Sequence, residues 1–287
     1  MTPVGFIGLG NMGGVLAANL VAAGHAVVEY DAAGPSRTTP GARFLDSAAA
    51  VGRGAGVVVL SLPDGLASRA VVGDLAAADG RTATLVVDTS TIGISAARAN
   101  AGALAEAGIG YVDAPVSGGV TGARARTLTV MYAGSDADCG TAEPFLTGLT
   151  DKPPIRVGDQ PGMAQAMKLA NNFLAATTLA ATSEAVAFGL AAGLDLATML
   201  GVLNASSGAS AATSDKFPRQ VLTGNYAAGF ANTLMAKDVR LYLESAGALD
   251  GPSEIGTLMA ALWARFAAAE PGADFTRIFP FVQETAN

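Results

Sequence analysis

The sequence has 287 residues, of which 51% are hydrophobic and 14% charged, so it is globular and long enough for two domains. Its formal net charge of −7, with no run of basic residues, argues against nucleic acid as a partner. One cysteine, Cys139, excludes an intramolecular disulfide and fits a reducing, cytoplasmic compartment. With one histidine, His25, a catalytic zinc site or a Ser–His–Asp system is hard to assemble, and we expect no metal.

The chain begins with a short apolar strand, Val4–Ile7, that runs into a glycine turn of the form G-x-G-x-x-G. A helical stretch over 15–23 and a second strand over 26–30 follow, and the strand ends on Asp31. This order of elements predicts a dinucleotide site rather than a glycine turn that binds nothing. The turn itself supplies the expected cofactor-binding residues Gly8, Leu9, Gly10, Asn11, Met12 and Gly13.

Each part of this turn has a physical function in such a site. Gly8 permits the tight turn, Gly10 lets the backbone approach a pyrophosphate, and Gly13 lets the helix pack closely on the strand. The N–H groups and positive dipole at the start of the helix then face the phosphates. Asp31 follows at close to the spacing of about 20 residues at which an acidic side chain binds the adenosine ribose.

Further apolar strands alternate with helical patterns, which predicts an α/β fold with a doubly wound, mainly parallel sheet covered on both faces. The predicted strands are 57–61, 84–88, 110–113, 127–132 and 155–157, with a helix over about 94–107. Loops that follow the strands would gather at one edge of the sheet, where ligands bind. These loops are Gly8–Gly13, Leu62–Pro63, Thr89–Thr91 and Ala114–Gly119.

No strand is predicted after Pro161, and the rest of the sequence is helical. The predicted helices are Met163–Ala192 and about 195–204, 211–222, 231–246 and 253–269. We therefore expect a dinucleotide-binding domain over 1–161 and an all-α domain over 162–287. The stretch Phe173–Leu194 is alanine-rich and contains Glu184, so we interpret it as a buried helix of a soluble protein rather than a membrane span.

Lys168 and Asn172 lie one turn apart on the first of these helices and share a face that is otherwise apolar. Spacing alone leaves two interpretations open, a solvated stripe or a functional pair.

Four motifs in order resemble the β-hydroxyacid dehydrogenase family, and within it the 3-hydroxyisobutyrate dehydrogenase type. They are Gly5–Gly13, Asp113–Gly119, Gly162–Asn172 and Leu234–Asp238, and the resemblance spans nearly the whole chain. It implies a long inter-domain helix, a helical second domain, and homodimers or homotetramers built largely through that domain. It also implies a small carboxylate-bearing substrate.

The resemblance also implies residue roles. Lys168 matches the catalytic lysine, and Asn172 a residue that contacts the reacting oxygen or its neighbours. Three positions, Ser117, Gly118 and Gly119, match the loop that holds the substrate carboxylate. Leu62, Pro63, Thr91 and Lys237 match cofactor-lining positions, and Asp238 a residue that orients Lys237. Neutral Lys168 would accept the alcohol proton during oxidation, and its ammonium would donate it during reduction. Burial beside cationic neighbours, such as Lys237, would lower its pKa from about 10.4 toward working pH.

The sequence departs from relatives at two places. Arg126 stands where relatives often have glycine, and Ala209, Ser210 and Ala211 stand where they often carry an arginine and a bulky aromatic. The second change suggests a roomier, less positive pocket, which disfavours a phosphate on the substrate. Asp31 would repel the 2′-phosphate of NADP, so we expect NAD as cofactor, although Arg37 could reach a phosphate and keeps NADP possible.

Alternative functions use the same fold. Reduction of tartronate semialdehyde or another short aldehyde acid would use the same residues. Imine reductases share the architecture but usually lack the lysine matched by Lys168. Non-catalytic, chromatin-associated relatives tend to lose this lysine and to carry basic extensions, and the chain does neither.

Overall fold

A computed structural model describes residues 2–285. The chain consists of two compact units, residues 1–168 and 169–287, and each is described by itself. The division falls inside one long helix, α7 (Met163–Ala191), which begins directly after Pro161–Gly162 and continues from the first unit into the second.

The first unit is built on one nine-stranded sheet with the strand order β3-β2-β1-β4-β5-β6-β8-β7. In that order the strands are β3 (Arg43–Phe44), β2 (Val27–Tyr30), β1 (Val4–Ile7), β4 (Val57–Leu60), β5 (Leu85–Asp88), β6 (Gly110–Asp113), β8 (Thr129–Ala133) and β7 (Val116–Ser117). All pairs from β3 to β6 are parallel, and β8 is antiparallel to both β6 and β7. The last strand, β9 (Ile155–Gly158), pairs in parallel with β8. The order reverses between β1 and β4, which creates the switch point where ligands bind in such sheets.

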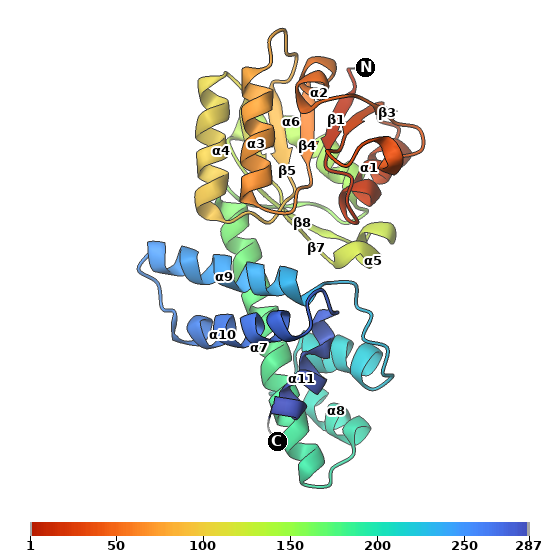
Figure 1. The fold of residues 1–287 in the computed structure, drawn as a ribbon, viewed down its shortest axis with the longest axis vertical. Coiled ribbons are helices and arrows are strands. Elements are labelled where there is room, and N and C mark those ends of the chain that lie inside the picture. Colours follow the sequence, from red (N-terminus) through yellow and green to blue (C-terminus); the bar gives the residue numbers. More distant parts are fainter. Residues whose placement is uncertain (1, 286–287) are drawn as a thin grey trace. The chain divides into compact units, whose positions relative to one another are not determined.

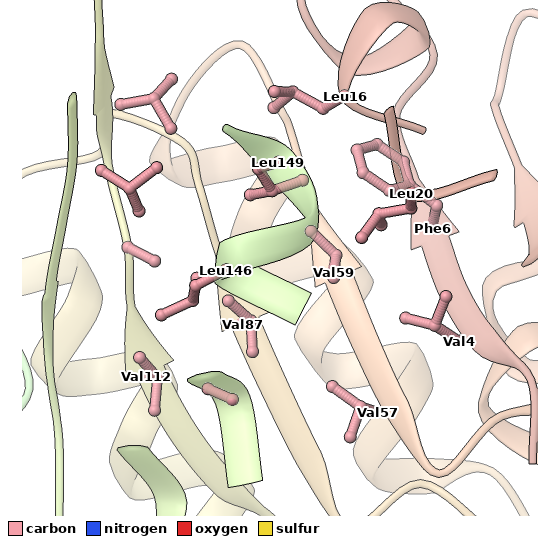
Figure 2. Close-up of a cluster of buried hydrophobic side chains, with 14 of the residues drawn as sticks. Val4, Phe6, Leu16, Leu20, Val57, Val59, Val87, Val112, Leu146 and Leu149 are labelled. Atoms are coloured by element: carbon pink, nitrogen blue, oxygen red, sulfur yellow. The ribbon is translucent and has the colours of Figure 1, made fainter. Parts of the chain in front are cut away.

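Helices cover both faces of this sheet (Figure 1). Side chains of α1 (Gly13–Ala22) and α6 (Asp136–Leu149) pack on one face, and those of α2 (Ala48–Gly54), α3 (Gly65–Ala77) and α4 (Ile94–Glu106) pack on the other. The strands alternate between these cores: Val57 and Val59 enter the first, whereas Val58 and Leu60 enter the second. Figure 2 shows the first core, in which Leu16 and Leu20 of α1 and Leu146 and Leu149 of α6 meet the strand valines.

The second unit is all helical in the described residues. After α7 come α8 (Leu196–Asn204), a π-helix (Ala212–Val221), α9 (Asn232–Ala248), α10 (Glu254–Ala269), a 3₁₀ turn (Phe275–Arg277) and α11 (Ile278–Thr285). Its core is aromatic, and Phe217, Trp263 and Phe266 are completely buried in it. Figure 1 shows α9 and α10 running side by side. Burial of each of these aromatic side chains contributes about 1.5–3 kcal/mol to the free energy of unfolding.

The predicted fold class is confirmed. Several local details differ from the sequence-based expectations. The helix after the glycine turn begins at Gly13 rather than Val15, and the segment 114–119 contains β7 and the start of α5 (Gly119–Arg124). The helix expected over 211–222 is a π-helix, and the helices α2, α3, α6 and α11 were not assigned from the sequence. Gly189 does not interrupt α7, whose length and composition alone would also suit a membrane span.

Candidate active site

The glycine turn connects β1 to α1 at the switch point of the sheet. Gly8 has φ +97°, a conformation that favours glycine, and a Cβ there would lie 2.3 Å from the carbonyl oxygen of Ser61. At Gly13 a Cβ would lie 1.9 Å from the carbonyl oxygen of Gly8, so only glycine lets α1 begin this close to the strand. Gly10 differs, because the nearest atom to its Cβ position is Arg37 Nη1 at 3.9 Å. The turn is therefore closed behind Gly8 and Gly13 and open at Gly10, which fits the approach of a pyrophosphate.

Asp31 lies directly after β2, and its carboxylate is bonded to the same turn. The Leu9 N–H donates to Oδ2 at 2.5 Å, and the Ala33 N–H donates to Oδ1 at 2.8 Å. Each carboxylate oxygen keeps further acceptor capacity. Asp31 therefore fixes the turn against the end of β2 while remaining able to accept hydrogen bonds from ribose hydroxyls.

The loops after β4 and β5 meet at the neighbouring strand ends. Ser90 Oγ accepts a hydrogen bond from the Leu62 N–H at 2.8 Å, which joins the Leu62–Pro63 loop to the loop that contains Thr91. Ser90 is in turn held by Asp88, whose Oδ1 accepts from the Ser90 N–H at 2.9 Å. The three expected cofactor-lining residues of this region thus lie on two loops tied together at one edge of the sheet.

A buried polar network around Asp88, at the end of β5, holds these loops in place. Asp88 Oδ2 accepts from the Ser68 hydroxyl at 2.7 Å and from the Tyr111 hydroxyl at 3.3 Å, and Asn100 Nδ2 donates to Ser68 Oγ at 2.8 Å. Burial raises the pKa of Asp88, and the same burial together with Asp88 and Asp113 raises the pKa of Tyr111 well above its usual value. The network is satisfied by short contacts, which makes the strand end rigid.

The expected carboxylate-binding loop lies between β7 and α5. Ser117 ends β7, opposite Thr129 of β8, and Gly118 and Gly119 follow with φ of +131° and +66°. A Cβ on Gly119 would meet nothing within 4 Å, so the backbone faces open space at this point. A loop with this conformation can present N–H groups and a hydroxyl to an anion.

Lys168 lies on the second turn of α7 and is buried, with 7% of its surface exposed. The residue one turn before it, Gln165, is completely buried and bonded to the β5–α4 loop. Its Oε1 accepts from the N–H groups of Ile92 at 2.9 Å and Gly93 at 3.1 Å, and its Nε2 donates to the Ser90 carbonyl at 2.9 Å. The helix segment that carries Lys168 is thus attached to the loop that contains Thr91.

Asp113, at the end of β6, holds the start of the same helix. Its Oδ1 accepts from the Gly162 N–H at 3.0 Å and its Oδ2 from the Gln165 N–H at 2.8 Å. Burial raises the pKa of Asp113 to about 6, although both hydrogen bonds oppose the shift. A carboxylate at this place satisfies two amides that a helix start leaves without intrahelical partners, and it complements the helix dipole.

In the second unit, Asn172, Lys237 and Asp238 come together between α7 and α9. Asn172 Nδ2 donates to Asp238 Oδ2 at 2.6 Å, and Lys237 Nζ lies 3.3 Å from Asp238 Oδ1. Asn171 Nδ2 donates to Asn172 Oδ1 at 3.1 Å. Oδ1 of Asp238 is buried without a geometrically aligned hydrogen bond, so the contact with Lys237 is an ion pair only. Asp238 thus orients Asn172 as well as Lys237.

Three of these residues were not in the predicted site. Gln165, Asp113 and Ser90 touch predicted site residues or their loops, but none was selected from the sequence. A signal existed for Gln165, because it lies on the face of Lys168 and Asn172, one turn before the lysine. Asp113 ends a buried strand inside a recognised motif, whereas nothing in the sequence reveals that Ser90 bonds the preceding loop.

The departures from relatives have structural explanations at two positions. Arg126 has φ +55°, a conformation that glycine adopts without strain, and its guanidinium bonds Asp151 at 2.7 Å and the Gly148 carbonyl at 3.1 Å. Ser210 Oγ accepts from the N–H groups of Ala212 and Thr213, two and three residues further along the chain, at the start of the π-helix. Arg124 is exposed, in keeping with its exclusion from the predicted site.

Comparison with known proteins gives consistent matches over the full chain. A family model described as the NAD-binding domain of 6-phosphogluconate dehydrogenase matches residues 3–157, and one described as NAD-binding of NADP-dependent 3-hydroxyisobutyrate dehydrogenase matches residues 162–282. The 3-hydroxyisobutyrate dehydrogenase of Pseudomonas aeruginosa is 38% identical over 97% of both chains. The 2-(hydroxymethyl)glutarate dehydrogenase of Eubacterium barkeri is 36% identical over 84% of this chain and 81% of its own. The structure of Mycobacterium tuberculosis 3-hydroxyisobutyrate dehydrogenase with L-serine superposes with a TM-score of 0.92, at 33% identity and 99% coverage of both chains.

These matches, on a doubly wound sheet with an open glycine turn at its switch point, define an oxidoreductase that acts on a hydroxyl group with NAD or NADP. The residues at the turn fit the dinucleotide, because the missing Cβ at Gly10 leaves open the space in which the pyrophosphate would lie. The chain belongs to the β-hydroxyacid dehydrogenase family, and within it to the 3-hydroxyisobutyrate dehydrogenase type. Among the described residues there is no group of three His, Cys, Asp or Glu side chains that could hold a metal ion.

Proposed function

We propose that the chain interconverts a small β-hydroxy acid, similar to 3-hydroxyisobutyrate, and its aldehyde, with NAD as the preferred cofactor and Lys168 as the general acid–base. The observation that carries the proposal is the attachment of the buried Lys168 segment, through Gln165, to the loop of Thr91. A nicotinamide cofactor, when bound, accepts or donates the hydride at the alcohol carbon.

Lys168 then handles the proton. During oxidation its neutral amine accepts the hydroxyl proton as the C–H bond is broken, and during reduction its ammonium returns a proton to the oxygen. Asn172, oriented by Asp238, donates a hydrogen bond to the reacting oxygen or its neighbours, and Lys237 lines the nicotinamide side. Ser117, Gly118 and Gly119 hold the carboxylate of the substrate.

The preference for NAD rests on charge. The carboxylate of Asp31 is bonded to the glycine turn and is expected to face the adenosine ribose, where it would repel a 2′-phosphate, and no arginine follows it directly in the sequence. Arg37 lies in front of Gly10, where the pyrophosphate is expected, and both cofactors share that group. Arg37 therefore strengthens binding of either cofactor without favouring NADP.

The side chain of the substrate is the least constrained part of the proposal. Small residues at Ala209 and Ala211 leave room, and loss of the arginine found in relatives disfavours a second anionic group. Tartronate semialdehyde and other short aldehyde acids are the second candidates, because the same residues would reduce them. We further propose that the enzyme is cytoplasmic and assembles as a dimer or tetramer through its helical unit.

The test is a spectrophotometric screen at 340 nm with both cofactors. Serine, 3-hydroxyisobutyrate, 3-hydroxypropionate, glycerate and threonate are offered for oxidation, and short aldehyde acids and cyclic imines are offered for reduction. We expect turnover of 3-hydroxyisobutyrate or a close homologue, and a loss of kcat on the order of 10²–10⁴-fold in Lys168→Ala. An unchanged kcat and pH–rate profile in Lys168→Ala would refute the role of the lysine. Tight cofactor binding without turnover of any acid would instead favour a non-catalytic binding protein, and turnover of cyclic imines alone would favour an imine reductase.

A further inference from the structure

The helix that carries Lys168 is attached to the sheet at two separate places. Asp113 holds the first-turn amides from the end of β6, and the Gln165 side chain holds the β5–α4 loop. The Asp113 contacts fix where the helix begins. The Gln165 contacts fix its rotation about its own axis, because they act on one side of the helix only.

The side-chain amide of Gln165 is chemically matched to its surroundings. It faces two N–H donors, from Ile92 and Gly93, and one acceptor, the Ser90 carbonyl. An amide supplies an acceptor oxygen and a donor nitrogen at once, whereas a carboxylate only accepts and an ammonium only donates. The site is completely buried, so water does not substitute for a missing partner.

The bonded loop also contains a position expected to line the cofactor. Thr91 stands between Ser90 and Ile92, which are both bonded to Gln165. Lys168 follows Gln165 by one turn on the same helix face. One side chain therefore connects the short helical segment that carries the amine to a loop expected to line the cofactor.

We propose that Gln165 is a positioning residue for proton transfer: its side-chain amide holds the Lys168 segment of α7 in fixed register with the Ser90–Gly93 loop. The inference rests on the proposed role of Lys168. It differs from a purely structural role, in which Gln165 stabilises the first unit and affects catalysis only through the amount of folded enzyme.

A double-mutant cycle separates the two roles, because a residue that acts through Lys168 has little to lose once Lys168 is gone. The variants are Gln165→Leu, Lys168→Ala and the double variant, each as the full-length enzyme. The readouts are kcat in the substrate-to-aldehyde direction, the dissociation constant of NADH from fluorescence, and the melting temperature. Asn19→Leu is the matched control, since Asn19 is another buried amide of the same unit and donates to the carbonyls of Ala123 and Leu149.

We expect Gln165→Leu to lower kcat on the order of 10²-fold in the wild-type background, the loss associated with a misplacement of about 1 Å. In the Lys168→Ala background the further loss should stay below about threefold. Asn19→Leu should lower the melting temperature with kcat unchanged in both backgrounds. If Gln165→Leu folds poorly, Gln165→Glu is informative, because it keeps the acceptor for the Ile92 and Gly93 amides and should fall between wild type and leucine.

Equal losses of kcat in both backgrounds would overturn the inference, and so would a wild-type kcat in a folded Gln165→Leu enzyme. A wild-type kcat in Lys168→Ala would instead refute the proposed function. The two failures are therefore distinguishable in the same set of measurements.

Discussion

Single residues at the glycine turn combine a structural and a chemical function, and Asp31 is the clearest case. Its carboxylate accepts amide hydrogen bonds from Leu9 and Ala33 and also sets the charge beside the expected adenosine ribose. A substitution that removes the charge but keeps one acceptor oxygen should alter cofactor choice with a limited effect on the turn.

We expect Asp31→Asn to raise kcat/KM for NADP relative to NAD by about 10- to 100-fold, because the repulsion of a 2′-phosphate disappears. The measurement is kcat/KM for both cofactors with one substrate. Asp79→Asn removes an exposed carboxylate elsewhere in the unit and should leave the ratio unchanged. A clear preference of the wild-type enzyme for NADP would contradict the argument from Asp31.

Residue types and spacing made the glycine turn predictable, because Gly8 and Gly13 must be glycine for steric reasons that act within a few residues. The bonds of Gln165 and of Ser90 were not predictable in the same way. They join segments distant in the sequence, so the helix face that Gln165 shares with Lys168 could single out the residue but not the loop that it bonds. Arg126 shows the converse, since a left-handed backbone can carry a non-glycine residue when its side chain finds partners.

At the level of elements, the start of α7 depends on the ionised form of Asp113. Only a carboxylate offers both oxygens as acceptors to the amides of Gly162 and Gln165, and protonation turns one of them into a donor. Because burial raises the pKa of Asp113 to about 6, this change falls within an accessible pH range. The other titratable groups near Asp113 are Asp88 and Tyr111. The charge of Asp113 is also one of the causes that raise the pKa of Cys139.

We expect kcat of the reduction reaction to fall as the pH is lowered from about 7 to 5, with a midpoint near the pKa of about 6 of Asp113. The reduction direction is chosen because protonated Lys168 is its active form, so the lysine contributes no loss at low pH. Asp113→Asn should show a lower kcat that does not change over this range. The Asp88→Asn enzyme should still show the fall of kcat between pH 7 and 5. Asp88 bonds Ser68, Ser90 and Tyr111 rather than α7.

The raised pKa of Asp113 has the opposite effect on stability, because low pH lowers kcat but stabilises the folded state. A carboxyl with a pKa of about 6 when folded and about 3.9 when unfolded binds its proton more tightly in the folded state. Its contribution to the free energy of unfolding therefore decreases as the pH rises from about 4 to 6 and stays constant above. The ionised carboxylate at the helix start is a modest thermodynamic cost, as is common at sites selected for function.

Element types were predictable for a long helix and for buried strands, although the helices α3 and α6 were not assigned from the sequence. The long α7 and the valine-rich β4 are examples. Short elements were not, because β3 and β7 have two residues each and depend on neighbouring strands for their hydrogen bonds. The π-helix has helical composition, and the wider turn is not encoded in hydrophobic spacing.

For the whole molecule, the feature that bears on assembly is the set of large apolar side chains exposed on the helical unit. Large apolar side chains project from several helices; Leu174, Phe188, Val202, Ile255 and Leu258 are each more than half exposed. Such surface is a mark of interfaces between subunits. It supports the proposed assembly through this unit.

We expect the native mass by sedimentation or light scattering to be two or four times 28.4 kDa. Phe188→Glu, at a side chain that is 77% exposed, should shift the mass toward that of one chain. Leu66→Glu changes an equally exposed leucine of the other unit and should leave the mass unaltered. A wild-type enzyme of single-chain mass would refute the assembly.

The attachment of Gln165 also has a consequence for engineering. Recombination of this enzyme with a relative would naturally exchange the helical unit, and the obvious crossover is the proline–glycine pair before α7. A crossover there would separate Gln165 from Ser90, Ile92 and Gly93, with which it is bonded. Chimeras joined downstream of Lys168 keep the Gln165 amide, the Lys168 amine and the Ser90–Gly93 loop from one parent. We expect a new substrate specificity without loss of kcat in these chimeras.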